Sequence, residues 1–369
     1  MKFLRFFKDN IVMTIAFLAA IITCFFVPPD ASYLGYFDFK TLTCLFCTLA
    51  VVCALKNIYF FRIVAHKIVC LFKTDRSAIL ALVYITFIGS MLIANDMALL
   101  TFLPLGYFVL SSTGKTRLLS FTFIMQTIAA NLGGMLTPFG NPQNLYLYSY
   151  FSITNGEFVK IMFLPFIIAI VLITLCCIVF VKNEPLVPRE GDYGKLNKGR
   201  TAIYLALFAF SIAIVFRSIP YYYGLIIIPL ALLFLDRKAL SAVDYPLLLT
   251  FCAFFVFSGN LARIPAVQNL LGGLVEKNTL LFGVLSCQFI SNVPSAVLLS
   301  KFTQNYQQLL VAVNIGGAGT LIASLASLIT FKEYNRHEPG HTMQYIGKYS
   351  AYNFGILSVL MVVMMVILR

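Results

Sequence analysis

A short phrase occurs twice in this chain of 369 residues, each time inside a long apolar stretch. Residues 131–137 read NLGGMLT and residues 314–320 read NIGGAGT. A second polar break precedes each copy, IAND at 93–96 and ISNV at 290–293. Glycine and asparagine weaken helices. Matching pairs of breaks in two halves of an apolar chain are typical of membrane proteins with an internal repeat around a central site. The pattern therefore predicts that architecture.

The composition favours a membrane protein. Hydrophobic residues make up 60% of the chain and charged residues 11%, whereas soluble domains have about 25% charged residues. The runs 11–27, 160–181 and 349–368 approach or reach the roughly 20 apolar residues that cross a bilayer. The sequence therefore predicts an all-α polytopic membrane protein surrounded by lipid.

The formal net charge of +13 is explained by membrane orientation. If the N-terminus is cytoplasmic and the C-terminus external, most of the 27 Lys and Arg residues lie on the cytoplasmic side. Cytoplasmic loops of membrane proteins usually carry such an excess of basic residues. We therefore expect a multi-pass protein of the plasma (inner) membrane. We expect no nucleic-acid partner.

The same topology predicts two inverted repeats, each with a re-entrant hairpin and a broken transmembrane helix. The first hairpin would open inward and the second outward, and the second repeat would have an extra leading span. A topology with two full spans per hairpin gives similar loop charges, so both stay open. The predicted segments are a first repeat 1–181, with a hairpin at about 77–110 and a broken helix at about 118–150; a cytoplasmic linker 182–200; and a second repeat 201–369, with a hairpin at about 279–300 and a broken helix at about 308–331.

One acidic residue cannot be placed in water by this topology. Of the 14 Asp and Glu residues, only Asp96 falls at membrane depth. A carboxylate in hydrocarbon is costly and usually functional. With no Lys or Arg at that depth in the predicted topology, its partner would be a cation, a proton or the N–H groups of a helix start. A protonated or capping role in the structure is the alternative.

The breaks supply the other candidate residues. Asn95 and Asn292 occupy equivalent places at the predicted tips, where an amide can bind an anion or a cation, or simply cap a helix. We expect no catalytic residue, and no metal beyond Na⁺. The predicted substrate-binding residues are Asn95, Thr137, Asn141, Asn144, Ser291, Asn292, Thr320 and Ser324. The predicted ion-coupling residues are Asp96, Asn95, Gly133, Gly134, Asn292, Gly316 and Gly317.

These motifs resemble those of the ion transporter superfamily. Residues 290–292 (ISN) are similar to the hairpin tip of divalent-anion/sodium symporters, and 133–144 resembles their Gly-Gly…Gly-Thr-Pro-Pro-Asn segment. Residues 94–96 (AND) are similar to the tip of arsenite permeases, and 323–327 (ASLAS) to their Gly-Ser-Leu-Ala-Thr segment. The chain thus resembles citrate-transporter-like proteins and divalent-anion/sodium symporters, with features of the arsenite permease family.

Residues and resemblance together lead to one main hypothesis. We expect a secondary transporter, not an enzyme, that moves a small anion such as a di- or tricarboxylate. Its coupling ion would be Na⁺ or H⁺, with no other cofactor, and a homodimer is one possible assembly. The alternative is an arsenite/antimonite efflux permease or a cation/proton antiporter, in which Asp96 would exchange the ligand for a proton.

Overall fold

The chain is helical, as predicted. The computed structural model describes residues 10–69, 71–185 and 196–368. Within these ranges the only β-type pairing is an isolated bridge between Thr74 and Pro185. The α-helices are α2 (Ile11–Phe26), α3 (Phe39–Asn57), α4 (Phe60–Val69), α5 (Asp75–Ile93), α6 (Asn95–Ser112), α7 (Leu119–Gly133), α8 (Pro142–Tyr150), α9 (Asn155–Phe180), α10 (Lys198–Val215), α11 (Tyr221–Leu235), α12 (Arg237–Ser241), α13 (Tyr245–Ala262), α14 (Pro265–Lys277), α15 (Thr279–Ile290), α16 (Asn292–Leu299), α17 (Tyr306–Ile315), α18 (Leu325–His337) and α19 (Thr342–Ile367). Three 3₁₀ segments, η1 (Ala31–Tyr36), η2 (Thr116–Leu118) and η3 (Gly134–Leu136), join them.

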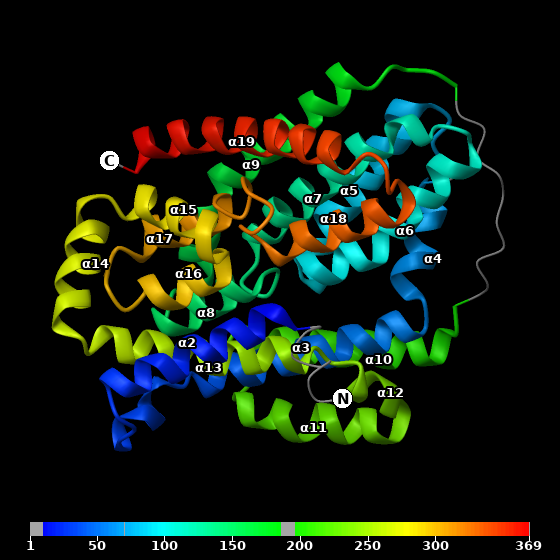
Figure 1. Ribbon diagram of the computed structural model, residues 1–369. Coiled ribbons are helices and arrows are strands. Elements are labelled where there is room, and N and C mark those ends of the chain that lie inside the picture. Colours follow the sequence, from blue (N-terminus) through cyan, green and yellow to red (C-terminus); the bar gives the residue numbers. More distant parts are fainter. Residues whose placement is uncertain (1–9, 70, 186–195, 369) are drawn as a thin grey trace.

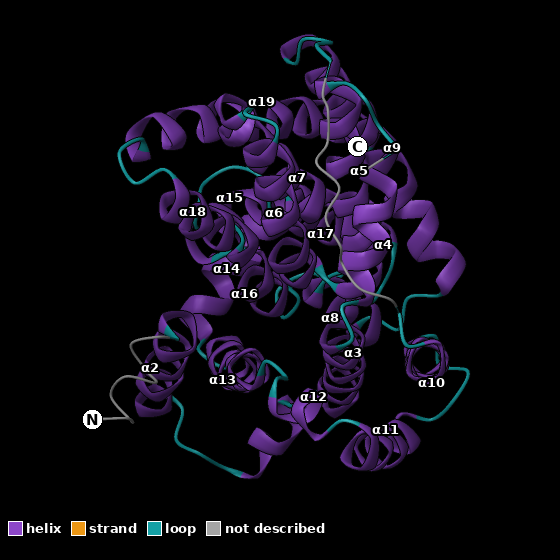
Figure 2. Cartoon of the chain, turned by 90° about the vertical axis from the view of Figure 1, so that its right-hand side faces the viewer, coloured by secondary structure: helices purple, strands orange, loops and turns teal. Residues whose placement is uncertain are grey.

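The helices form two layers (Figure 1, Figure 2). We call α2, α3, α10, α11 and α13 the scaffold layer, and α5–α9 with α15–α19 the core bundle. In the scaffold layer α2 packs on α13, and α3 packs on α10 and α11. α4 and α14 lie at opposite ends of the molecule and lead from the scaffold layer into the core bundle (Figure 1). The breaks singled out by the sequence all lie in the core bundle.

The two halves place similar elements in the same order. From α3 to α9, and again from α13 to α19, a long helix is followed by a connecting helix, a helical hairpin, an interrupted helix and another long helix. α10 is an additional helix at the start of the second half. No helix was predicted from the sequence at the position of α14. The chain bends by 119° between α14 and α15. The inverted orientation of the halves remains a prediction.

Seven of the described helices are long and apolar enough to cross a membrane, or eight if α14 and α15 form one bent span. This supports a multi-pass membrane protein. Residues 1–9, part of the predicted linker (186–195), Cys70 and the last residue lie outside the described residues. The predicted positions of the two termini and of most of the linker therefore remain predictions.

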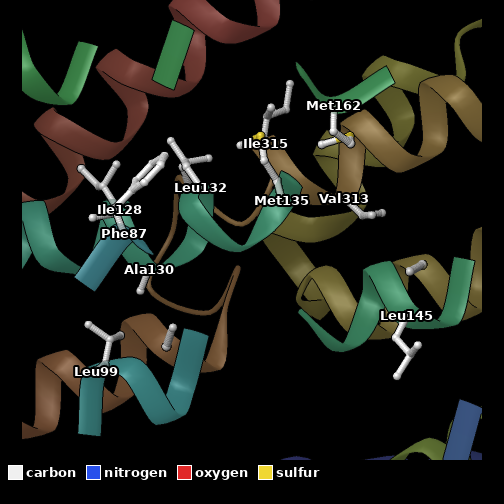
Figure 3. Close-up of a cluster of buried hydrophobic side chains, with 14 of the residues drawn as sticks. Phe87, Leu99, Ile128, Ala130, Leu132, Met135, Leu145, Met162, Val313 and Ile315 are labelled. Atoms are coloured by element: carbon white, nitrogen blue, oxygen red, sulfur yellow. The ribbon is translucent and has the colours of Figure 1, made fainter. Parts of the chain in front are cut away.

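Apolar side chains hold the interrupted helices in place. Figure 3 shows Phe87 of α5 and Leu132 of α7 beside one break, with Met135, Val313 and Ile315 nearby. All five are buried. In a membrane, close packing of such side chains stabilises a helix bundle through van der Waals contacts. The core bundle can thus hold short helix ends and polar breaks in fixed positions.

Candidate functional site

Both helical hairpins turn through an unusual backbone conformation. The residue after α5 is Ala94, with φ +66°, and the residue after α15 is Ser291, with φ +73°. Residues other than glycine seldom adopt a positive φ, and such strained positions concentrate at functional sites. The next residue is Asn95 in one hairpin and Asn292 in the other. In each case the asparagine Oδ1 accepts from the following backbone N–H at 2.9 Å. Each asparagine is thus the first residue of its helix and satisfies one N–H of the first turn, whereas the N-cap residues Ala94 and Ser291 make no side-chain cap bond.

Each hairpin is tied to the break in its own half by a threonine. Thr137 donates its hydroxyl to the carbonyl of Met91 at 2.9 Å, and Thr320 donates to the carbonyl of Gln288 at 3.0 Å. Met91 and Gln288 each lie four residues before the tip asparagine. The two predicted threonines thus occupy equivalent positions, with their donors already used inside the core bundle.

The glycine pairs permit close contact. A Cβ on Gly133 would overlap the Phe87 carbonyl of α5, and a Cβ on Gly316 would lie 2.9 Å from the Cys287 Sγ of α15. A Cβ on Gly317 would lie 3.1 Å from the Nδ2 of Asn292. The first glycine of each pair therefore lets the interrupted helix approach the hairpin. The second glycine of each pair lies close to a side-chain amide, Gly134 to that of Asn141 and Gly317 to that of Asn292.

A buried asparagine joins the two halves. The Oδ1 of Asn131 accepts from the Nδ2 of Asn95 at 3.2 Å and from the hydroxyl of Ser324 at 2.8 Å. Its Nδ2 donates to the carbonyl of Gly317 at 3.2 Å. In the other half, Asn314 donates to the Oδ1 of Asn144 at 2.6 Å. The sequence analysis did not name Asn131 or Asn314 as site residues, although each leads one copy of the repeated phrase.

A cavity of about 490 Å³ lies between the tips and the scaffold layer. Four of the predicted substrate-binding residues line it: Asn95, Ser291, Asn292 and Ser324. Asp96 lines it too. The opposite wall comes from α2 and α13, with Ile15, Thr250 and Phe254 among its residues.

The other predicted residues are not part of the cavity wall. Among the described residues, Thr137, Asn141, Asn144 and Thr320 do not line it, and neither do the two glycine pairs. They lie at the breaks, where Asn144 donates to the carbonyl of Gly134 at 3.0 Å and Asn141 to the carbonyl of Asn131 at 3.4 Å. The structure therefore separates the predicted set into residues that face the cavity and residues that hold the breaks.

Four helices begin at the cavity. α6, α8, α16 and α18 contribute Asn95, Pro142, Asn292 and Leu325 from their first residues. A helix start has a partial positive charge from its N–H groups and attracts anions. No Lys, Arg or His lines the cavity in the described part of the chain, and Asp96 is its one acid. Neutral amides and helix starts, rather than basic side chains, are therefore the groups that face a ligand in this cavity.

Fold and site together define a multi-pass membrane protein with a cavity between two helical hairpins and two interrupted helices. The chain belongs to the Citrate transporter family, whose model matches residues 6–311. This confirms the resemblance seen in the motifs, and the protein is a membrane transporter.

Two relatives extend over most of the chain. An uncharacterized transporter of Methanocaldococcus jannaschii is 33% identical over 299 residues, which are 81% of this chain and 82% of that protein. The inner membrane protein YbiR of Escherichia coli is 29% identical over 346 residues, 91% of each chain.

Proposed function

We propose that the protein is a secondary active transporter that moves a small organic anion across the plasma membrane, coupled to Na⁺ or H⁺. The observation that carries the proposal is the start of four helices at one cavity, together with the amides of Asn95 and Asn292. Neutral donors of this kind bind an anion without a permanent counter-charge. Membership of the Citrate transporter family supports the same class of substrate.

The need for coupling follows from Asp96. An anion in this cavity shares it with a carboxylate, and in the low dielectric of the membrane two like charges repel strongly. A proton on Asp96, or a Na⁺ beside it, removes that repulsion. Binding of the anion and of the cation then favour each other, which is the basis of symport. The predicted coupling role of Gly133–Gly134 and Gly316–Gly317 is a separate proposal, because these glycines do not line the cavity. The carbonyls of Gly134, Gly316 and Gly317 each accept a hydrogen bond from a side-chain amide.

A second candidate function is efflux of arsenite or antimonite, or cation/proton antiport. The observation in its favour is that Asp96 lines the cavity with no basic side chain among the described residues around it. In that mechanism Asp96 would exchange a neutral or cationic ligand for a proton.

The proposed orientation has a cytoplasmic N-terminus and an external C-terminus, with re-entrant hairpins entering from opposite sides. Thr116 and Gln304 are exposed in the loops after α6 and α16. Thr116→Cys should be labelled only from the cytoplasm, and Gln304→Cys only from outside. Labelling of both from one side would contradict the two-hairpin topology. The proposal includes a homodimer, to be tested by cross-linking in the membrane.

The function is tested by uptake into proteoliposomes. The panel contains monocarboxylates, dicarboxylates, tricarboxylates, sulfate and arsenite, with Na⁺ and pH gradients imposed separately. We expect gradient-driven uptake of an organic anion, lost in Asn292→Ala. Arsenite movement against a proton gradient, with no organic anion transported, would favour the second candidate.

A further inference from the structure

The cavity wall is polar at the tips and mainly apolar elsewhere. The polar part at the tips includes Asn95, Asp96 and Asn292. The remaining wall has the hydroxyl residues Thr250 and Ser324 and is otherwise apolar. Its apolar side chains are Ile11, Val12, Ile15 and Ala19 of α2, Leu247, Phe254 and Phe257 of α13, Phe289 of α15, and Ile322, Leu325 and Leu328 at and after the break between α17 and α18.

Charge in and around the cavity disfavours a polyanion. The lining residues of the described chain include Asp96 and no basic side chain. A second acid, Asp244, is the N-cap residue of α13, the helix that contributes to the opposite wall of the cavity. The four helix starts carry about half a positive charge each, and the charge of Asp96 cancels half of that total, so about one negative charge on a ligand head is balanced. Further carboxylates would lie against the apolar wall, where nothing replaces their hydration.

We infer that the substrate is an organic monoanion with an apolar body, such as an aliphatic or aromatic monocarboxylate. This inference rests on the proposed function and names its substrate class. The head contacts the two tip amides and the starts of α6 and α16. The apolar body lies between α2, α13 and the break that separates α17 from α18. A cavity of about 490 Å³ falls within the range of roughly 300–1,000 Å³ that holds small organic molecules.

Two exposed phenylalanines offer a matched pair for testing the apolar wall. Phe289 lines the cavity and is 76% exposed. Phe234 of α11 is 77% exposed, and it is not among the residues that line the cavity in the described chain. Substituting either leaves the buried core intact, so neither change should unfold the protein. Ile322→Thr, at the second break, changes the wall at an independent position.

The experiment is calorimetric binding to the protein in lipid nanodiscs, with and without Na⁺, using empty nanodiscs to subtract partitioning. The probes are acetate, butanoate and hexanoate, compared with citrate and tricarballylate. Affinity should rise about fourfold for each added CH₂ that is buried, and both tricarboxylates should bind more weakly than hexanoate. Phe289→Ala and Ile322→Thr should weaken hexanoate binding and leave acetate binding unchanged. Phe234→Ala should behave as the unsubstituted protein.

Three outcomes would contradict the inference. Tighter binding of citrate than of hexanoate, abolished by Asn292→Ala, would overturn the monoanion class while supporting the proposed function. An affinity independent of chain length would exclude the apolar wall from the site. No binding and no uptake of any organic anion would overturn the proposed function itself.

Discussion

The tip between α5 and α6 and the tip between α15 and α16 follow the same backbone path but have different side chains. Each has one residue of positive φ, then an asparagine that accepts from the next backbone N–H. Each is also held by a threonine from the break in its own half. The residue after the asparagine differs: Asp96 in the first tip and Val293 in the second.

The tips also differ in how they are attached. The first is bonded through a side chain, from Asn95 to Asn131 at 3.2 Å. The second is bonded through both its backbone and a hydroxyl, because the N–H of Asn292 and the hydroxyl of Ser291 both donate to the carbonyl of Ala323, at 2.9 Å and 3.3 Å. Gln288 adds a bond to the carbonyl of Gly316 at 2.9 Å and accepts from the N–H of Thr320 at 2.8 Å.

The comparison suggests a division of roles. The shared backbone brings an amide and a helix start from each tip to the cavity. Under the proposed function, the acid at the first tip places coupling to a cation there, and the second tip contributes its amide to ligand binding. The predictions below test this division, from the largest expected effect to the smallest.

Loss of either tip amide should have the largest effect. Asn95→Ala and Asn292→Ala each remove a group that faces the cavity, and we expect transport to be abolished while the protein stays folded. Asn278 is the control, because it caps the opposite end of α15 by accepting from the N–H of Leu281 at 2.8 Å. Asn278→Ala should cost about 1 kcal/mol of stability and retain uptake. If all three variants transport alike, the tips are only caps.

Removal of Asn131 should have the next largest effect. Asn131→Ala leaves the amide of Asn95, the hydroxyl of Ser324 and the carbonyl of Gly317 without their shared partner. A buried polar group left unpaired costs roughly 1–3 kcal/mol. We expect uptake to fall about tenfold or more, with a lowered melting temperature. Uptake unchanged at equal expression would show that the two halves do not depend on this link.

The two threonines should give matched, moderate effects. Thr137→Val and Thr320→Val keep the shape and remove one hydrogen bond each, worth about 1 kcal/mol. Thermal unfolding should show similar losses of stability, and substrate affinity should change little because neither residue lines the cavity. A large loss of affinity in one variant alone would place that hydroxyl in direct contact with the ligand.

The smallest effect should come from the ion pairs at the open end of the first hairpin. Lys115 pairs with Glu184 at 2.7 Å and with Asp75 at 3.0 Å. The hydrogen bond from Lys115 holds the pKa of Glu184 below its usual value. The ion pair therefore stabilises the fold fully at pH values above the ordinary glutamate pKa. This stabilisation is lost as the pH falls through the lowered pKa of Glu184. Glu184→Gln should slightly lower the melting temperature at neutral pH and reduce its fall in acid. If the melting temperatures of Glu184→Gln and the unsubstituted protein fell equally in acid, this ion pair would not contribute to the pH dependence of stability.

The sequence was sufficient to predict the helical class, the family and the positions of the breaks. It placed Asn95 and Asn292 at equivalent breaks because both interrupt apolar runs. It could not separate the residues that face the cavity from those that hold the breaks. Thr137 and Asn144 are polar residues in an apolar segment, and only their contacts show that they bond to the backbone.

Two further features could not be predicted from local pattern. The link from Asn131 to Gly317 joins positions 186 residues apart, and nothing in either segment specifies its partner. The scaffold wall of the cavity is made by ordinary apolar helices, α2 and α13, whose residues look like any lipid-facing span. Their place opposite the tips depends on packing between distant helices.

The most direct test of the division between the tips is transport by Asp96→Asn in proteoliposomes. The amide keeps the shape and hydrogen bonding of the side chain but removes its charge. The account predicts that uptake driven by a Na⁺ or pH gradient is lost, while exchange of labelled for unlabelled substrate continues. Loss of exchange as well would favour the antiport mechanism. Gradient-driven uptake with the unaltered Na⁺ and pH dependence would contradict the account, because coupling would then not involve Asp96.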